Sequence, residues 1–269
     1  MQDSSQTPAV EFRSVTMDFD GVLALDDVSF RLEHGEMLFI TGISASGKSV
    51  LMRLAIGLEP PTSGQIFVDG TEIDHMDERH LLTLRTNKMG IVFQENSLFT
   101  SMSVYDNTAY RLVEHGWDEA ATDEAVHQIL RFVGLDESVD LLPAELSIGM
   151  RRRLELARAL VGWPRVMLFD EPTSGLDPMT QKSVMNLIIS ARDTHDVSSL
   201  YVTKEMHELK YLAEHRAEGG DILEGGPPSR VMLLDAGRIV FLGPVAEFFA
   251  GTDTRITAMT HPQGSRSHN

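Results

Sequence analysis

The chain has 269 residues, 42% hydrophobic and 23% charged, which is enough to bury one large core or two small ones. Forty acidic residues against 23 basic ones give a net charge of −17, which opposes non-specific binding to nucleic acid or to an anionic membrane surface, and the lack of cysteine excludes disulfides and thiolate metal sites. Without a secretory leader pattern or an apolar run long enough to span a bilayer, we expect a soluble cytoplasmic protein that reaches a membrane only through a partner.

The first part of the chain alternates strand patterns with helix patterns. Residues 10–15 and 28–32 alternate apolar and polar side chains, as half-buried strands do, and the apolar run 37–41 predicts a strand covered on both faces. A helical pattern begins near Lys48 and stops near Gly57. Further strands are predicted at 66–68 and 90–93, with a helix at about 77–85 between them.

The middle of the chain is predicted to be helical from about 103 to 162, with one helix beginning at Ser147. Strand and helix patterns then alternate again: strands at 166–169 and 199–203 enclose a helix, and 231–234 and 239–242 flank an Asp-Ala-Gly turn, which predicts a hairpin. Residues 217–229 are expected to form a surface loop. This order predicts an α/β core with a helical insertion.

Residues 42–49 satisfy the pattern G-x-x-x-x-G-K-[ST] between a predicted buried strand and an amphipathic helix, the context that this phosphate-binding loop needs. Small residues let backbone N–H groups approach a phosphate, and the helix N-terminus adds partial positive charge. Lys48 would supply a cation to the β- and γ-phosphates, and the Ser49 hydroxyl would coordinate Mg²⁺. The residues expected to bind ATP here are Gly42, Ser44, Ala45, Ser46, Gly47, Lys48, Ser49 and Val50.

A pair of carboxylates, Asp170 and Glu171, ends the strand predicted at 166–169. Charges after an apolar run are costly unless they are paired or hold a cation. A strand that has simply reached solvent is the alternative explanation, which the nearby phosphate loop disfavours. We expect Asp170 to hold Mg²⁺, directly or through a water, and Glu171 to polarise a water that attacks the γ-phosphate.

The order of these motifs resembles that of the nucleotide-binding subunits of ATP-binding cassette (ABC) transporters, over about residues 10–242. The resemblance implies a P-loop NTPase core made of a mixed sheet with flanking helices, an antiparallel N-terminal β-subdomain and an inserted all-helical subdomain. It places the core and β-subdomain at 10–94 and 163–243, the helical subdomain at 95–162, and a C-terminal helix and flexible tail at 244–269.

The same resemblance implies roles for residues outside the two motifs. Gln94 resembles the family's Q-loop glutamine, with a part in catalysis and in holding the metal. Residues 146–150 (L-S-I-G-M) resemble the family's signature and 174–177 its D-loop, so Ser147, Gly149 and Asp177 are expected to contact nucleotide. Phe19 takes the place of the aromatic residue that stacks on adenine, with an ordinary apolar contact as the alternative.

Short sequence segments resemble one type within this family, the Mce/Mla type. They are Val50 in the phosphate-loop helix, V-F-Q-E-N-S-L-F at 92–99, L-P-A-E-L-S at 142–147 and M-R-R-R at 150–153. Those ATPases power the movement of lipids or hydrophobic solutes across cell envelopes. An Mce-type lipid-binding protein would then be a further partner, through the complex.

Three departures from the family pattern bear on activity. Ala45 replaces a common glycine, a mild change as long as its φ stays negative. Ile148 replaces the first signature glycine, and a β-branched side chain resists positive φ and adds bulk near the opposing nucleotide. Lys204 stands where the family has its switch histidine; it can bind the γ-phosphate as a cation, but it cannot orient protons as imidazole does. His207 is a less favoured substitute, expected in the first turn of the next helix and pointing elsewhere.

The resemblance predicts an ATPase at the cytoplasmic face of the inner membrane. Two copies would hold each Mg²⁺–ATP between the phosphate loop of one and Ser147 and Gly149 of the other, and the loop at 97–102 would dock on an integral-membrane permease, unless it is an ordinary solvated connection. The alternative is an ATP-binding, dimerising regulatory module that hydrolyses weakly because of Lys204 and Ile148. The signature and D-loop disfavour a kinase, the lack of coiled-coil heptads and the acidic charge disfavour a DNA-repair ATPase, and a translation factor would need two cassettes.

Overall fold

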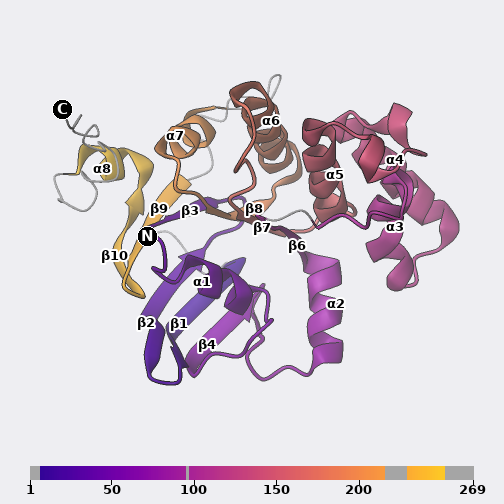
Figure 1. Cartoon of the computed structure of the whole chain (residues 1–269). Helices are drawn as coiled ribbons and strands as arrows, with labels where there is room; N and C mark the ends of the chain where they lie inside the picture. Colours follow the sequence, from indigo (N-terminus) through magenta and orange to yellow (C-terminus); the bar gives the residue numbers. More distant parts are fainter. Residues whose placement is uncertain (1–6, 95–96, 216–228, 252–269) are drawn as a thin grey trace, which may run out of the picture.

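The computed structural model describes residues 7–94, 97–215 and 229–251. Its central element is a six-stranded sheet with the order β10-β9-β3-β8-β7-β6, shown across the middle of Figure 1. Pairing is parallel from β9 through β3, β8 and β7 to β6, and β10 joins β9 antiparallel, so the sheet is mixed. The strands are β3 (Met37–Thr41), β6 (Met89–Val92), β7 (Val166–Asp170), β8 (Ser198–Val202), β9 (Ser229–Asp235) and β10 (Arg238–Pro244).

A second, antiparallel sheet with the order β2-β1-β4-β5 packs below the first. Its long hairpin pairs Phe12 with Phe30, whose rings stack with centroids 4.7 Å apart. The turn sequence Asp69-Gly70, with positive φ at both residues, joins β4 to β5. The strands are β1 (Val10–Phe19), β2 (Val22–Leu32), β4 (Ser63–Val68) and β5 (Thr71–Glu72).

Helices α6 and α7 cover the other face of the six-stranded sheet, whereas α1 and α2 lie on the side of the antiparallel sheet; α3, α4 and α5 gather at one side of the molecule (Figure 1). Polar side chains begin several of these helices by accepting hydrogen bonds from backbone N–H groups; Ser103 and Asp106, for example, form a capping box. The helices are α1 (Lys48–Ala55), α2 (Glu78–Lys88), α3 (Val104–Glu114), α4 (Glu119–Val133), α5 (Ile148–Leu160), α6 (Pro178–His195), α7 (Met206–Glu214) and α8 (Val245–Ala250), with 3-10 turns at Asp136–Ser138 and Pro143–Glu145.

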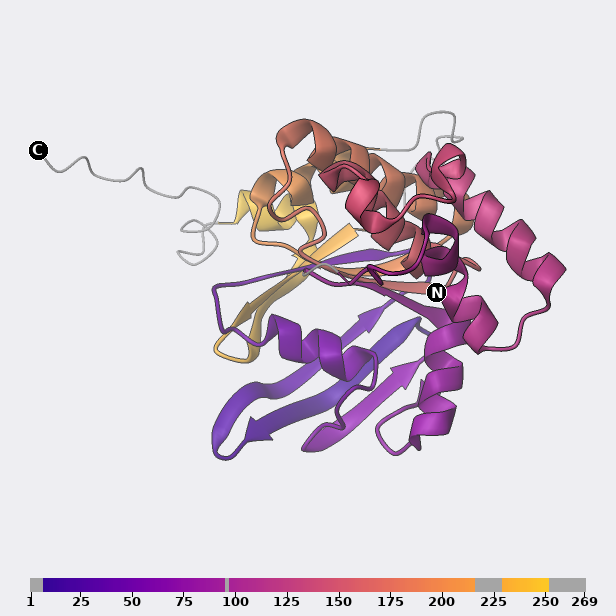
Figure 2. The same ribbon diagram turned by 45° about the vertical axis from the view of Figure 1, so that its right-hand side comes forward.

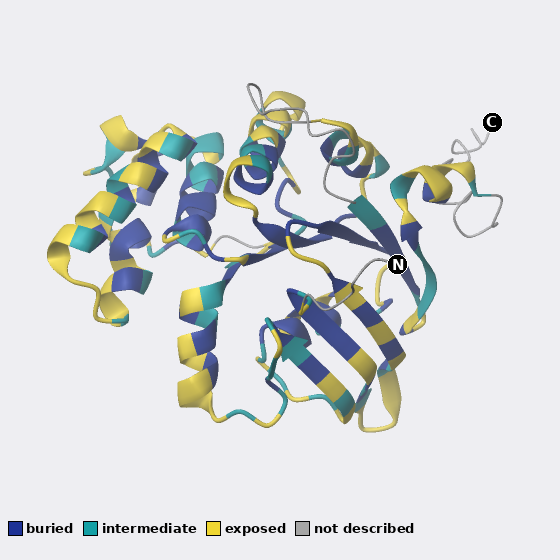
Figure 3. Cartoon of the chain, turned by 180° about the vertical axis from the view of Figure 1, so that it is seen from behind, coloured by how far each residue is buried: buried dark blue, intermediate teal, exposed yellow. Residues whose placement is uncertain are grey.

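The six-stranded sheet separates two hydrophobic cores, because successive side chains of a strand point to opposite faces. In β3, Met37 and Phe39 pack under the helices, whereas Leu38 and Ile40 pack toward the antiparallel sheet and α1. Figure 3 shows the sheet buried between these layers. Strands covered on both faces therefore read as continuous apolar runs, which made them visible in the sequence.

The predicted fold class is confirmed, including the antiparallel hairpin of β9 and β10. The observed ends of helices and strands differ from the predicted ones by a few residues. Helix α6, for example, begins at Pro178, well before the first residue of its apolar pattern, because Asp177 caps it. The short strand β5 was missed. The predicted loop at 217–229 falls outside the described residues except for its last position, and the tail after Gly251 lies wholly outside them. Among the described helices, none combines the length and apolarity needed to cross a bilayer.

Candidate nucleotide site

The parallel strands bring most of the predicted site to one edge of the sheet. β3, β8, β7 and β6 are neighbours that run in the same direction, so their carboxyl ends meet there. Gly42 follows β3, Lys204 follows β8, Glu171 follows β7 and Gln94 follows β6. Segments far apart in the sequence therefore converge on the phosphate loop.

Lys48 begins α1 and folds back over the phosphate loop. Its Nζ donates to the carbonyl oxygens of Gly42 at 2.8 Å and Ile43 at 2.7 Å and to the Ser46 hydroxyl at 3.2 Å. Burial is the main cause that lowers the Lys48 pKa, followed by the charge of Lys204, while Glu171 and Asp170 oppose the shift. The loop thus holds a desolvated cation in place, ready for an anion that enters the loop.

Two glycines of the loop are required by close approach. A Cβ on Gly42 would lie 2.2 Å from the Leu234 carbonyl oxygen, and one on Gly47 would lie 2.5 Å from that of Ala24. Ala45, by contrast, adopts a left-handed φ of +63°. The condition under which this replacement would be mild, a negative φ, is therefore not met: the loop keeps the turn that a glycine would make, at a cost of about 1–2 kcal/mol for a Cβ-bearing residue.

The loop is also clamped by the turn between β9 and β10. The Gly237 N–H donates to the Ser46 carbonyl at 3.2 Å, and the Gly237 carbonyl accepts from the Asp26 N–H at 2.9 Å. This turn therefore bridges the phosphate loop and β2. The sequence pattern of the loop gave no sign of these supports, because they come from distant segments.

Glu171 lies in the most crowded part of the edge. Its φ is +45°, and its N–H donates to the Val202 carbonyl at 3.0 Å, which fixes the backbone after β7 against β8. Its carboxylate contacts Lys204 Nζ at 2.6 Å and accepts from Gln94 Nε2 at 3.4 Å. Burial and then the neighbouring Glu171 raise the pKa of Asp170, while Lys204 and Lys48 oppose that shift.

The polar groups at this edge fit a bound magnesium ion. Ser49, Asp170 and Gln94 offer hydroxyl, carboxylate and amide oxygens, the hard ligands that Mg²⁺ takes in phosphate sites. The raised pKa of Asp170 is the mark of negative charge held in a desolvated place, which a divalent cation would relieve. The residues present are therefore a suitable donor set for Mg²⁺ beside a triphosphate.

Ser147 and Gly149 line a pocket of about 340 Å³, together with Asp177 and Thr180. Ser147 caps α5 by accepting from the Met150 N–H at 3.2 Å, and Asp177 caps α6 by accepting from the Thr180 N–H at 3.1 Å. The pocket lining contains no residue of the phosphate loop. The predicted nucleotide contacts thus divide into two groups on one chain.

Ile148 is the first residue of α5 and is 62% exposed. It is not among the described residues with positive φ, so the predicted conflict between a β-branched side chain and left-handed backbone does not arise. The side chain instead projects from the surface beside Ser147. The predicted bulk toward an opposing molecule is consistent with this exposure.

Arg152 connects the two groups, and sequence reasoning missed it. Its guanidinium donates to the carbonyl oxygens of Phe93 at 3.1 Å and Gln94 at 3.3 Å, and to Glu155 at 2.5 Å. The Arg152 and Glu155 side chains are 9% and 5% exposed. The signature helix is therefore tied to the segment that carries Gln94. The run of three arginines in the sequence was the signal, but it does not reveal which one turns inward.

A buried carboxylate, Glu208 on α7, forms a further network that the sequence did not predict. It accepts from the hydroxyls of Tyr201 at 3.1 Å and Thr203 at 2.9 Å, and from that of Thr173. The loop after Glu171 and the end of β8 are thereby joined to one helix.

Two further predicted residues lie at the surface. Phe19 ends β1 and is 40% exposed, as a residue that stacks on a base would be. His207 is in the first turn of α7, where its Nδ1 lies 3.6 Å from Glu205, as expected of a residue that does not replace the switch histidine.

Comparison with known proteins decides the family. The family model described as ABC transporter matches residues 25–174. The chain is 38% identical to the methionine import ATP-binding protein MetN 2 of Rhodococcus jostii, over 91% of this chain and 68% of that one. The chain belongs to the ABC transporter family.

Another relative supports this membership, and solved structures share the fold. The chain is 36% identical to MetN of Haemophilus influenzae, over 87% of its own length and 63% of that protein's. Among solved structures, cbiO1 of Clostridium perfringens, part of the complex cbiONQ, gives a TM-score of 0.76 at 27% identity and 95% coverage of both chains. A dimeric structure of the bacterial cassette MJ0796 gives 0.74 at 23% identity, over 88% of this chain and 98% of that one.

The chain is therefore an ATP-binding subunit of an ABC transporter and an ATPase. The expected likeness to the Mce/Mla type is not supported, since these relatives are named methionine importers. The strings that suggested it lie among or beside the residues predicted to contact nucleotide, and no comparison links them to a cargo.

Proposed function

We propose that this ATPase works as a homodimer in which each Mg²⁺–ATP lies between the phosphate loop of one copy and the Ser147 pocket of the other. The observation that carries the proposal is the division of the nucleotide contacts into two groups on one chain. Ser147 and Ile148 are exposed at a helix N-terminus, which favours a negatively charged ligand. A second copy with its phosphate loop turned toward this helix would complete both sites.

Within each site, the chain's own groups divide the work. Lys48 would hold the β- and γ-phosphates, and Ser49, Asp170 and Gln94 would hold Mg²⁺, which supplies charge to stabilise the phosphoryl group in transfer. Glu171 would take a proton from the attacking water, since it lies at the end of β7 with Gln94 against its carboxylate. Lys204 would add a cation at the γ-phosphate. Asp177 would contact the nucleotide site from the D-loop.

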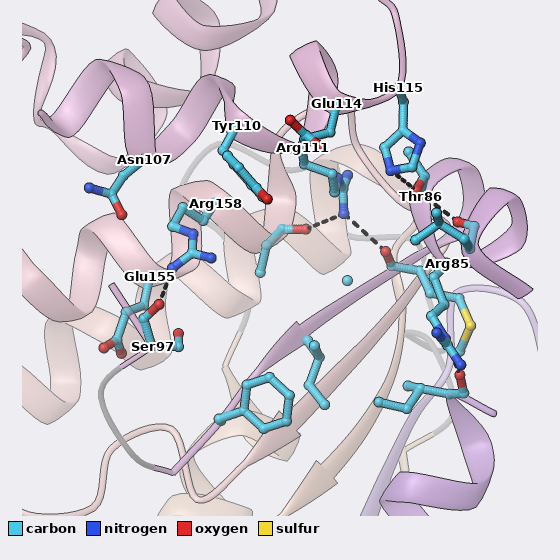
Figure 4. A pocket seen from close by; sticks show the side chains of 17 residues that line it. Arg85, Thr86, Ser97, Asn107, Tyr110, Arg111, Glu114, His115, Glu155 and Arg158 are labelled. Carbon is cyan, nitrogen blue, oxygen red and sulfur yellow. Dashed lines mark hydrogen bonds between the residues drawn. The ribbon is translucent and has the colours of Figure 1, made fainter. Parts of the chain in front are cut away.

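A permease would dock in a cavity of about 380 Å³ between α2, β6, α3 and α5, seen from close by in Figure 4. Its wall combines exposed apolar side chains, Leu82 and Phe93, with the charged heads of Arg85 and Glu114. This mixture suits a short amphipathic helix from the membrane subunit. Phe93 lines this cavity and directly precedes Gln94, so a displacement of Phe93 by the bound helix would also move Gln94.

The predicted docking loop at 97–102 lies beside this cavity, and Ser97 lines it. Asn107 fixes the loop: its side chain accepts from the Phe99 N–H at 2.9 Å and donates to the carbonyl oxygens of Phe99 and Met102. The loop is therefore held against α3, and its first residue, Ser97, reaches the wall of the cavity. Binding there would hold the subunit at the cytoplasmic face of the membrane through the permease.

The cargo best supported is a small amino acid, since the relatives are named for methionine import. Cargo is tested by co-purifying the chain with its membrane subunits and measuring ATP hydrolysis in lipid nanodiscs. Stimulation by methionine with its solute-binding partner supports import of an amino acid. Stimulation by phospholipid transfer instead would restore the lipid cargo and its Mce-type partner.

Substitution of Glu171 tests the ATPase mechanism and separates it from a regulatory module that barely hydrolyses. Glu171→Gln should lower the rate of phosphate release by at least about 100-fold and accumulate an ATP-bound dimer, because the water loses its base. The exposed Glu214→Gln on α7 serves as the matched control and should keep the full rate. A Glu171→Gln rate equal to that of the unmodified protein would refute this assignment.

A further inference from the structure

Lys204 forms an ion pair with the Glu171 carboxylate, the group that must accept a proton in the proposed mechanism. Lys204 Nζ lies 2.6 Å from Glu171 Oε1, and the Gln94 amide donates to Oε2 of the same carboxylate. Both oxygens of the Glu171 carboxylate are therefore engaged by donors from this chain. A water that is to lose a proton to Glu171 must compete with a cation for Oε1.

The backbone next to Lys204 is held by hydrogen bonds of Thr203, whereas the Lys204 side chain is partly exposed. The Thr203 N–H donates to the Ile40 carbonyl at 3.1 Å, and the Thr203 hydroxyl joins the buried carboxylate of Glu208 at 2.9 Å. The Lys204 side chain is 47% exposed, whereas that of Glu171 is 14% exposed. A flexible four-carbon stem on an anchored backbone can exchange partners without moving the strand.

A γ-phosphate bound by Lys48 would compete with Glu171 for the Lys204 ammonium group. Lys48, which grips the phosphate loop, is close enough to Lys204 for the two charges to repel, and this repulsion contributes to the lowered pKa of Lys48. Two cations, one at the start of α1 and one just after β8, thus lie near each other at the edge of the sheet. A terminal phosphate that enters this space carries more negative charge than the single carboxylate that Lys204 holds.

We propose that Lys204 is a nucleotide-operated latch on Glu171: it holds the carboxylate while the site is empty and transfers to the γ-phosphate when ATP binds, which frees Glu171 to accept a proton from water. The latch rests on the proposed role of Glu171. No covalent bond is made or broken in this step, since one ion pair is exchanged for another. ADP lacks the γ-phosphate and leaves the latch closed.

A double-mutant cycle on nucleotide affinity tests the latch without relying on turnover. ATP and ADP binding are measured by calorimetry for the unmodified protein, Glu171→Gln, Lys204→Gln and the double variant. Glu171→Gln removes the partner that Lys204 must leave, so it should tighten ATP binding about three- to tenfold more when Lys204 is present than when it is Gln. For ADP the two effects should agree within about twofold.

Two variants separate the latch from a structural role. Lys204→Arg keeps a cation that pairs with carboxylate and phosphate, so it should retain the coupling that Lys204→Gln loses. Lys210→Ala, on the exposed face of α7, should leave ATP and ADP affinities unchanged. Equal effects of Glu171→Gln on ATP affinity in both Lys204 backgrounds would overturn the latch. Coupling present without any loss of phosphate release in Glu171→Gln would sustain the exchange of ion pairs and overturn the proposed role of Glu171 as the base, so the two failures are distinguishable.

Discussion

The phosphate loop follows the buried strand β3, whereas Ser147 begins a helix at the surface of the group formed by α3, α4 and α5. The loop is held by its own lysine and by the turn at Gly237, so it is a finished structure within one chain. The pocket at Ser147 presents a hydroxyl, Ile148 and a helix N-terminus outward. The phosphate loop can bind an anion within one chain, whereas the Ser147 pocket can contribute to a nucleotide site only when a second molecule faces it.

The largest effect should come from disabling each region separately and then mixing the two proteins. Lys48→Ala should weaken ATP binding at least about 100-fold, because a desolvated cation is lost. Ser147→Glu should leave the affinity of the isolated chain within about twofold, yet lower hydrolysis by about 100-fold through repulsion of the opposing phosphate. Mixed in equal amounts, they should regain about a quarter of the original rate, since half of the dimers carry one intact site.

Ser63→Glu, at the exposed start of β4, is the control for an added charge and should keep the full rate. A mixture as inactive as its components would mean that the two regions do not complete each other across copies.

A smaller effect is expected where the two regions are tied together, at Arg152. Arg152→Gln should lower the free energy of unfolding by about 3 kcal/mol, because Glu155 would be left buried without its partner. Urea unfolding measures this loss, and the exposed Arg131→Gln on α4 is the control. The double variant Arg152→Met with Glu155→Leu should recover most of the stability. A loss under about 0.5 kcal/mol in the single variant would show that the tie is not a strong one.

The smallest effect concerns the backbone of the phosphate loop. Ala45→Gly should raise the free energy of unfolding by about 0.5 kcal/mol, since relief of the left-handed strain at φ +63° exceeds the entropy that glycine adds to the unfolded chain. Ala213→Gly, inside α7, should instead lower it by about 1 kcal/mol. Thermal unfolding of both variants gives the comparison. Destabilisation by Ala45→Gly equal to that of Ala213→Gly would contradict a strained loop.

Local pattern was sufficient for the features that depend on neighbours in the chain. The phosphate loop, the carboxylates after β7 and the start of α5 at Ser147 each follow from a short string with its flanking strand or helix. The buried strands were visible because both faces are covered, so that Met37–Thr41 is apolar throughout.

Features that depend on packing between distant segments were beyond the sequence. The left-handed φ of Ala45 is imposed by the loop as a whole, and the ion pair of Lys204 with Glu171 depends on β7 and β8 being neighbours. The choice of Arg152 as the inward arginine depends on where Gln94 lies. The cargo could not be predicted for a different reason: the residues expected to bind ATP do not contact the transported solute, so their identities contain no information about it.

The turn at Gly237 places a condition on the synthesis of this chain. On the ribosome, the phosphate loop emerges long before the turn that clamps it, so the nascent chain carries the complete string G-I-S-A-S-G-K-S before the Ser46 carbonyl can meet its donor. β9, which leads into this turn, pairs parallel with β3, the strand that leads into the loop. The loop is therefore finished only after the hairpin of β9 and β10 has been made, and a fragment that ends before this hairpin contains the motif without its clamp.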